Sequence, residues 1–306
     1  ALLVLFWFRT RFKGGLQSRR EAWAGWAFAS PWMVGFVCFT GGPLLCSLVM
    51  SFCTYDAMSP SRLVYLRNYE EMFCDDRLFA LSLWNTGFML IGIPLGMAAG
   101  LGVALLLDAN VRGMSFYRTL FFLPSIVPGV ASALLWILIL NPNNGILNWA
   151  LERVGLPRLN WLQDQNWSKP ALILHGLWGA GSGMIVWLAG LKEIPTDLYE
   201  AAAIDGASVS QRFRHITIPM LTPYIFFSLV MGLIGTFQIF GPAYLMTAGG
   251  PVNSTLFYVY NLFNQAFRYL HMGYASALAW VLFAVVFGLT MFQIRMSKRW
   301  VHYQGE

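Results

Sequence analysis

Six long apolar blocks constrain this chain more than any other feature of its sequence. Each block has about the length that an α-helix needs to cross ~30 Å of hydrocarbon. Of the 306 residues, 57% are hydrophobic and 11% are charged, whereas charged residues make up roughly 25% of a soluble domain. The sequence therefore predicts an all-α polytopic membrane protein with six transmembrane helices, at residues 23–54, 86–107, 119–140, 171–191, 217–246 and 274–294.

Basic residues between the apolar blocks indicate how the chain is oriented. If the N-terminus is cytoplasmic, thirteen of the twenty Lys and Arg residues lie on the inner side, and seven are spread over longer outer loops. The positive-inside rule favours this orientation, which places both termini and the loop 192–216 in the cytoplasm. We interpret the net charge of +6 as a topology signal. A nucleic-acid partner would require a basic face on a soluble fold.

The same reading divides the chain into three regions. We expect a cytoplasmic N-terminal segment at 1–22, a six-helix transmembrane domain at 23–294 and a cytoplasmic tail at 295–306. The apolar stretch Ala1–Phe8 is too short to span a membrane and lacks an initiator Met. It is interpreted as the remnant of a trimmed tail or as an interfacial helix.

The predicted spans lack the groups that ion-driven carriers and membrane enzymes use. They contain no Asp, Glu, Lys or Arg, and His175 is their one ionisable side chain of this kind. An ion-driven carrier normally holds its coupling ion on such a group, and an integral-membrane enzyme or scaffold, the alternative class, predicts a cluster of them. The chain also lacks a G-x-x-x-x-G-K-[ST] phosphate loop and a metal-ligand spacing of its four cysteines. We expect no catalytic residue, metal or bound cofactor here, and ATP on a partner.

The loop between the fourth and fifth spans has the pattern of a short helix. Pro195 ends the preceding helix, and Asp197 is predicted to cap the next one, with Glu200 returning a bond in a variant of the capping box. Four residues recur at i, i+3, i+4 and i+7 and share one slim face: Leu198, Ala201, Ala202 and Asp205. Such a face suits close approach to a groove on another protein.

A stop signal and a second start signal follow this helix. Gly206 supplies a C-terminal stop, and Ser208 with Gln211 predicts the cap of a second short helix. Pro219 and Pro223 then mark the entry to the fifth span. The result is a helix-turn-helix elbow, although capping and spacing alone are equally compatible with a solvated connector.

The whole string resembles the E-A-A-x-x-x-G-x₉-I-x-x-P signature of permeases from binding-protein-dependent ABC importers. Glu200, Ala201, Ala202, Gly206, Ile216 and Pro219 match it. The carbohydrate-importing branch typically reads I-P-x-x-L-Y-E-A-A-x-I-D-G-A, which Ile194, Pro195, Leu198, Tyr199, Ile204, Asp205, Gly206 and Ala207 match. T-A-G-G-P at Thr247–Pro251 and M-G-Y-A-S-A at Met272–Ala277 are also similar to that branch, so the resemblance extends from about Asn85 to the C-terminus.

The resemblance implies a type I ABC importer permease fold, in a bacterial cytoplasmic (inner) membrane, with no catalysis on this chain. It further implies four partners: a second permease, a dimer of ATP-binding subunits that holds ATP and Mg²⁺, an extracytoplasmic solute-binding protein, and a carbohydrate. The elbow would be the coupling helix, which contacts the ATPase through Leu198, Tyr199, Glu200, Ala201, Ala202, Asp205 and Gly206.

A mixed polar and aromatic face on the fourth span is a candidate substrate path. His175, Trp178, Gly179 and Ser182 follow i, i+3, i+4 and i+7, and sugars stack on aromatic rings while their hydroxyls bind polar groups. Thr236 and Gln238 are at comparable depth on the fifth span, whereas Gly232 is better explained by helix packing.

Helix packing is the alternative for the whole set. At the aligned positions, His175 and Trp178 differ in residue type from maltose-type importers, so the sugar stays open, including an acidic oligosaccharide. A non-sugar solute such as glycerol phosphate is the alternative substrate.

Overall fold

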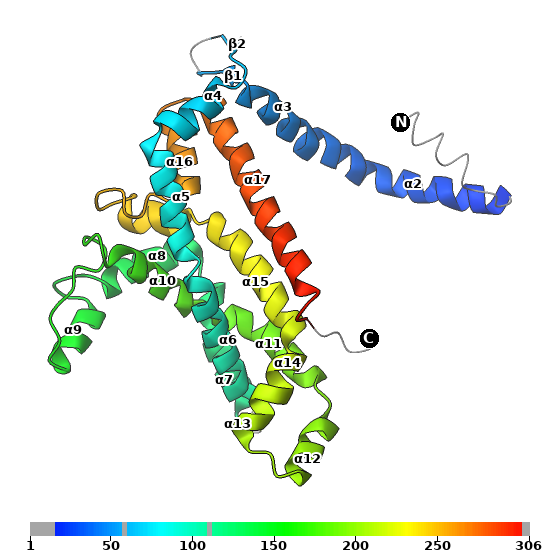
Figure 1. Cartoon of the computed structure of the whole chain (residues 1–306), viewed down its shortest axis with the longest axis vertical. Coiled ribbons are helices and arrows are strands. Elements are labelled where there is room, and N and C mark those ends of the chain that lie inside the picture. Colours follow the sequence, from blue (N-terminus) through cyan, green and yellow to red (C-terminus); the bar gives the residue numbers. More distant parts are fainter. Residues whose placement is uncertain (1–15, 57–59, 109–111, 302–306) are drawn as a thin grey trace.

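The computed structural model describes residues 16–56, 60–108 and 112–301, and these are almost entirely helical (Figure 1). The stretch Ala1–Phe8 lies outside the described residues. Three helices are long and apolar enough to span a membrane, namely Trp23–Ser51, Arg77–Asp108 and Met272–Ser297. Three further pairs of helices meet this criterion together but are bent, so six spans result when each pair counts as one. The predicted all-α, six-span architecture is confirmed.

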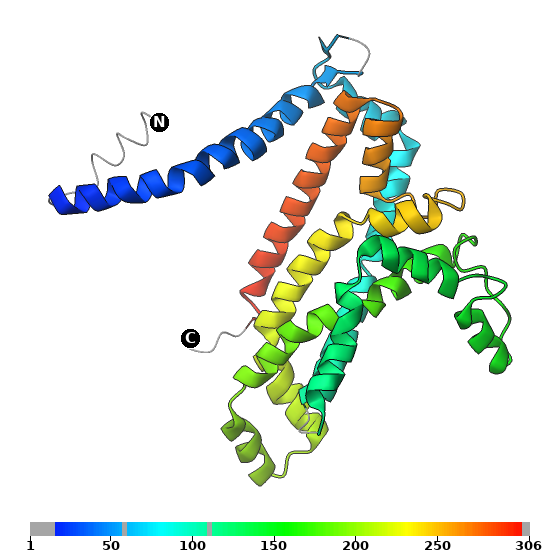
Figure 2. The same ribbon diagram turned by 180° about the vertical axis from the view of Figure 1, so that it is seen from behind.

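The first span extends away from the rest of the chain in both views (Figures 1 and 2). It consists of α2 (Leu16–Phe36), a π-helical turn η1 (Val37–Gly41) and α3 (Gly42–Ser51). The α3 part packs on α17 (Met272–Ser297), where Trp280 Nε1 donates a hydrogen bond to Ser47 Oγ at 3.2 Å. None of the residues in the most apolar window of this span is buried.

The end of the molecule opposite α12 (Thr196–Ile204) joins the first, second and last spans (Figure 1). A short hairpin of β1 (Cys53–Thr54) and β2 (Arg62–Leu63) leads into α4 (Arg67–Glu70), η2 (Glu71–Asp75) and α5 (Arg77–Met89). Asp76 caps α5, because its Oδ1 accepts a hydrogen bond from Leu78 N at 2.7 Å. Its Oδ2 accepts another from the hydroxyl of Tyr274 at 2.6 Å, which fixes α5 to α17.

The third span is broken where the sequence predicted one helix at 119–140. It consists of α7 (Met114–Ile126) and α8 (Gly129–Ile139), bent by 97°. Pro128 stands at the N-cap of α8 with a ψ of 138°, and a proline here removes a backbone donor and excludes a continuous helix.

The fourth span is also broken, at Gly179 and Ala180. It consists of α10 (Ser168–Trp178) and α11 (Gly181–Glu193), bent by 52°. The break coincides with a close contact to α7, because a Cβ on Gly181 would lie 1.8 Å from the carbonyl oxygen of Phe121. The expectation of an unbroken helix over 171–191 is wrong, and the bend lies where this tertiary contact forms.

The fifth span bends by 63° near Leu221. Below the bend lie α13 (Val209–Arg212), the π-helical turn η3 (Phe213–Thr217) and α14 (Ile218–Met220), and above it lies α15 (Thr222–Phe237). Pro219 and Pro223 flank the bend, where their missing N–H groups leave carbonyl oxygens without helical donors.

The second span continues from α5 into α6 (Gly92–Asp108). The remaining elements connect the spans: α9 (Ile146–Arg153), α12 (Thr196–Ile204), η4 (Ala243–Thr247), α16 (Tyr258–Phe263) and η5 (Asn264–Arg268). In Figure 1, α12 lies at the opposite end of the molecule from β1 and β2. A buried cluster that includes Trp187, Leu191, Ile194 and Leu221 lies between α11 and the start of α15 and supports the elbow.

Candidate functional site

The first helix of the elbow, α12, begins directly after a proline. Pro195 is its N-cap residue, with a ψ of 131°, and no side chain bonds to the helix start. Asp197 lies in the first turn instead of at the cap, so the predicted Asp197–Glu200 capping box is wrong. The physical reason is that the fixed φ of Pro195 already sets the chain direction at this position.

The turn of the elbow follows the sequence prediction. Gly206 has a φ of +77°, and Ala207 N donates to the carbonyl oxygen of Ala202 at 2.8 Å, which closes the helix end. The second helix, α13, starts with a complete capping box, because Gln211 Oε1 accepts from Ser208 N at 2.7 Å and Ser208 Oγ accepts from Gln211 N. Both local predictions are confirmed.

The surface of the elbow is apolar at its tip. Most of the residues predicted to contact the ATPase are exposed, namely Leu198, Glu200, Ala201, Asp205 and Gly206, and Ala202 is half-buried. Two large apolar side chains outside the predicted contact set are also exposed: Ile204 is 87% exposed and Val209 is 74% exposed. They flank the turn on both sides, and an apolar β-branched pair around a glycine stop was the available signal.

Tyr199 differs from the other residues of the predicted contact set. Its ring is half-buried and packs against the buried cluster between α11 and the start of α15. Its hydroxyl lies 2.8 Å from Thr217 Oγ1. This side chain therefore faces the bundle and not the exposed surface of the elbow.

A cavity of about 460 Å³ lies between α6, the broken span α10–α11, and α15. It is lined by His175, Ser182 and Thr236 of the predicted path, whereas Trp178, Gly179 and Gln238 do not line it. The wall formed by α6 includes Gly92 and Gly96. The sequence interpretation gave no role to this helix. The spacing of Gly92, Gly96 and Gly100 by four residues was the signal for a small-residue face.

His175 is held by α8 at the edge of this cavity. Its Nε2 lies 3.0 Å from Ser132 Oγ, and its ring meets the Trp136 ring edge-on at 5.7 Å. Trp178 also packs edge-on against Trp136, at 6.2 Å. Because the span bends after Trp178, the expected continuous face of His175, Trp178, Gly179 and Ser182 does not form.

Two small or polar positions of the fifth span have separate explanations. A Cβ on Gly232 would lie 2.9 Å from Ile93 Cγ2, which agrees with the packing interpretation of this glycine. Gln238 is exposed at the end of α15. Thr236 is buried beside the cavity.

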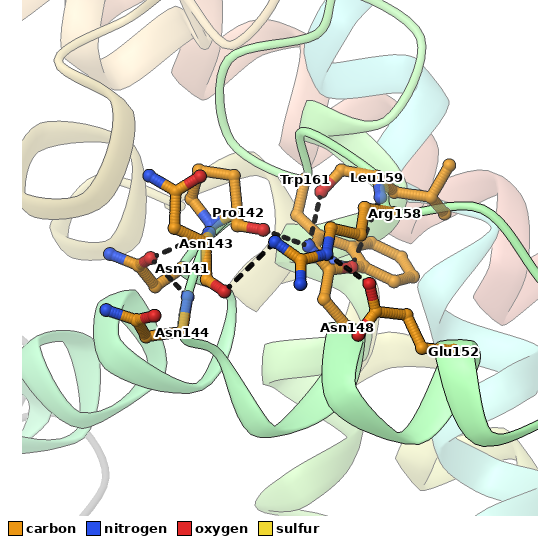
Figure 3. Close-up of polar contacts among 9 residues, drawn as sticks. All are labelled: Asn141, Pro142, Asn143, Asn144, Asn148, Glu152, Arg158, Leu159 and Trp161. Carbon is orange, nitrogen blue, oxygen red and sulfur yellow. Dashed lines mark hydrogen bonds and ion pairs between the residues drawn. The ribbon is translucent and has the colours of Figure 1, made fainter.

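An arm at residues 141–167 connects α8 to α10 and is organised by one buried side chain (Figure 3). Asn148 of α9 donates to the carbonyl oxygens of Pro142 and Leu159, and its Oδ1 accepts from Leu159 N and Trp161 Nε1. Glu152 and Arg158 form an exposed ion pair beside it. The arm is thus a folded unit and not an irregular loop.

Comparison with known proteins gives one family. Residues 92–300 match the family described as "Binding-protein-dependent transport system inner membrane component". The chain is 43% identical over 293 residues to the probable ABC transporter permease protein YesP of Bacillus subtilis (strain 168), covering 94% of each chain. It is 34% identical to the sn-glycerol-3-phosphate transport system permease protein UgpA of Brucella abortus, covering 90% of this chain and 94% of that one. It is 30% identical to the trehalose/maltose transport system permease protein MalF of Thermococcus litoralis, covering 91% and 95%.

The fold is also that of solved structures. A crystal structure of a bacterial ABC transporter involved in the import of the acidic polysaccharide alginate contains a chain that superposes with a TM-score of 0.81 at 23% identity, covering 92% of this chain and 98% of that one. The same kind of transporter in complex with an alginate pentasaccharide-bound periplasmic protein gives a TM-score of 0.80. At 23% identity, this similarity is evidence for a shared fold alone.

Proposed function

The chain belongs to the family of inner membrane components of binding-protein-dependent transport systems, and from this premise we propose that it forms, with a second permease, the path for a carbohydrate. It is a permease subunit of an ABC importer. In the proposal, an extracytoplasmic receptor delivers the sugar and a partner ATPase drives its passage. This chain supplies the path and the elbow that contacts the ATPase. The partner ATPase binds ATP with Mg²⁺ and hydrolyses the ATP.

The observation that carries this proposal is the geometry of the elbow. The turn at Gly206 places two exposed apolar side chains, Ile204 and Val209, at the end of the molecule that is farthest from the outer hairpin (Figure 1). Exposed large apolar residues on a polar loop are costly in water and are typical of a protein contact. The closed turn and the capped second helix make the elbow a defined shape, as a groove on an ATPase requires.

The first span supports a second permease as partner. Its most apolar window has no buried residue within this chain, and α2 extends far from the other spans (Figure 2). Lipid can cover one side of such a helix, but a helix that leaves its own bundle gains packing contacts only from another protein. We propose that α2 packs on the second permease.

The cavity supports a carbohydrate over a phosphomonoester. Its lining residues, all in the described part of the chain, include hydroxyl groups and the His175 ring but no Lys or Arg. A phosphate group buried at membrane depth would lack a cationic partner there, whereas hydroxyl groups of a sugar need only neutral donors and acceptors. Glycerol phosphate stays the alternative because a 34% identical relative is named for it.

We also propose that both termini and the elbow face the cytoplasm of a bacterial cell. The positive-inside distribution of Lys and Arg supports this orientation. The region limits 1–22, 23–294 and 295–306 stay predictions. Reporter fusions after Ser210 and after Arg299 test the orientation, and an extracytoplasmic signal from either would contradict it.

The test of the function uses the complete complex in lipid vesicles. Receptor-dependent ATP hydrolysis and uptake are measured with neutral oligosaccharides, with uronate oligosaccharides and with glycerol phosphate. We expect one of the two oligosaccharide classes to stimulate both activities. Stimulation by glycerol phosphate alone would support the alternative, and vesicles without ATP-dependent uptake of any solute would contradict the proposal.

A further inference from the structure

Tyr199 connects the elbow to the transmembrane bundle. Leu198 and Glu200, its neighbours, are exposed, whereas the Tyr199 ring packs against the cluster that contains Leu191, Ile194 and Leu221. Among the side chains of α12, all within the described residues, Tyr199 alone has a hydrogen bond to another element. The elbow helix is thus fixed to the bundle through one ring and one hydroxyl.

The partner of that hydroxyl lies at the base of the helix that borders the cavity. Thr217 is 4% exposed and is the last residue of η3, directly below the bend that leads into α15. Its carbonyl oxygen accepts a hydrogen bond from Leu221 N at 3.0 Å, so its position is fixed to the bend itself. A displacement of Tyr199 therefore acts on the base of α15.

A second contact fixes α11 to the same base. The Tyr224 hydroxyl donates to Glu193 Oε2. A Cβ on Gly190 would lie 2.7 Å from Tyr224 Cδ2 and 2.8 Å from Leu221 Cδ2, so the two helices are in direct contact. Both α11 and α15 line the cavity, through Ser182 and Trp187 on one side and Thr236 on the other.

We propose that the Tyr199–Thr217 hydrogen bond makes α12 move as one body with α11 and α15. Tyr199 is then a positioning residue that transmits the motion of the ATPase to the cavity, and it does not contact the ATPase itself. The inference rests on the proposed docking of the elbow. Without the bond, the exposed turn at Asp205–Ser208 would absorb the displacement of α12, because few other contacts fix this helix.

The test measures whether α12 moves relative to α15 in the complete complex. Spin labels are placed at Ala203 and Phe227, both exposed, after replacement of the four native cysteines. Distances are recorded without nucleotide and after trapping with Mg-ATP and vanadate. In the native background, we expect the same distance distribution in both states.

Tyr199→Phe retains the ring and removes the hydroxyl. We expect a second distance population in the trapped state, with about a fivefold increase in the detached form, the effect of one net hydrogen bond. Thr217→Val is expected to give the same result, Thr217→Ser to behave as the native chain, and the double variant Tyr199→Phe with Thr217→Val to add nothing. Tyr117→Phe is the matched control, because the Tyr117 hydroxyl has no hydrogen bond among the described residues.

Three outcomes would overturn the inference: a single unchanged distribution in Tyr199→Phe, a shift already present in the native complex, or an equal shift in Tyr117→Phe. Gel filtration of each complex separates loss of assembly from loss of transmission. Absence of vanadate-sensitive ATP hydrolysis in the native complex would instead contradict the proposed function, so the two failures are distinguishable.

Discussion

The side chain of Asn148 pairs with both backbone polar groups of Leu159. Its Nδ2 donates to the Leu159 carbonyl oxygen at 2.9 Å, and its Oδ1 accepts from Leu159 N at 3.2 Å. With the bonds to Pro142 and Trp161, at 3.0 and 2.9 Å, all four bonding positions of the amide are used. One buried side chain therefore fixes the segments of the arm on both sides of α9.

Removal of this amide should loosen the arm. Asn148→Leu leaves two carbonyl oxygens and two N–H groups without their partner, so we expect local destabilisation by about 2 kcal/mol. Asn148→Asp replaces the donating nitrogen with an oxygen that faces two carbonyl oxygens, and should have a larger effect. Hydrogen exchange of residues 146–161 measures it. Asn143→Ala is the control, because only the backbone of Asn143 bonds within the network; equal exchange in all variants would contradict the role of Asn148.

The exposed ion pair of the same arm predicts a pH dependence. The hydrogen bond from Arg158 lowers the pKa of Glu152 below its ordinary value of 4.5. A lowered pKa in the folded arm means that the stabilisation is present above pH 4.5 and is lost as the pH falls through the lowered value. The protection of α9 amides should therefore differ between the native chain and Glu152→Gln at pH 7. We expect this difference to shrink at high salt and to vanish at acidic pH; a difference that grows with acid would refute the assignment.

The close contact at the break in the fourth span predicts that alanine destabilises the chain much more at Gly181 than at Gly183. A Cβ on Gly181 would meet the backbone of Phe121 at 1.8 Å, whereas a Cβ on Gly183 has its nearest neighbour, Trp187 Nε1, at 3.9 Å. Gly181→Ala should destabilise the chain by about 1–3 kcal/mol, and Gly183→Ala should be tolerated. Thermal unfolding of the purified complex, followed by tryptophan fluorescence, compares the two. Equal midpoints would mean that α7 and α10–α11 do not pack this closely.

Substitution of two glycines of α15 separates an effect on the cavity from an effect on helix packing. Both glycines line the cavity, but an added Cβ on Gly235 has no atom within 4 Å, whereas an added Cβ on Gly232 would lie 2.9 Å from Ile93. Gly235→Leu should fill part of the path and lower uptake, with normal assembly. Gly232→Leu should lower the amount of assembled complex instead. ATP-dependent uptake in vesicles, divided by the amount of assembled complex, separates these effects, and unchanged uptake in Gly235→Leu would remove the cavity from the path.

Two changes in the elbow test docking to the ATPase. Ala201→Glu adds a bulky charge to the exposed face, and Gly206→Val places a β-branched residue at a φ of +77°, which costs about 1–3 kcal/mol. Both should leave the spans inserted and lower the recovery of the ATPase in pull-downs, together with uptake. Ala203→Ser, on an exposed position outside the predicted contact set, is the control. Normal assembly and uptake in both variants would contradict the docking.

Local signals in the sequence determined the features that depend on a few neighbouring residues. The apolar blocks predicted the six spans, Gly206 predicted the left-handed stop, and Ser208 with Gln211 predicted the second cap, because hydrophobic length and backbone capping involve residues within a few positions of one another. The match to the family signature was possible for the same reason, since the elbow is a contiguous string.

The tertiary structure alone decided the features that join distant residues. The bend of the fourth span lies where Gly181 contacts Phe121, the Tyr199 hydroxyl is bonded to Thr217, and the cavity includes a wall from α6. The helical period placed His175, Trp178, Gly179 and Ser182 on one face only under the assumption of a straight helix. A one-dimensional pattern carries no information on which two helices approach closely, and that approach sets where a helix bends and which side chains then face one another.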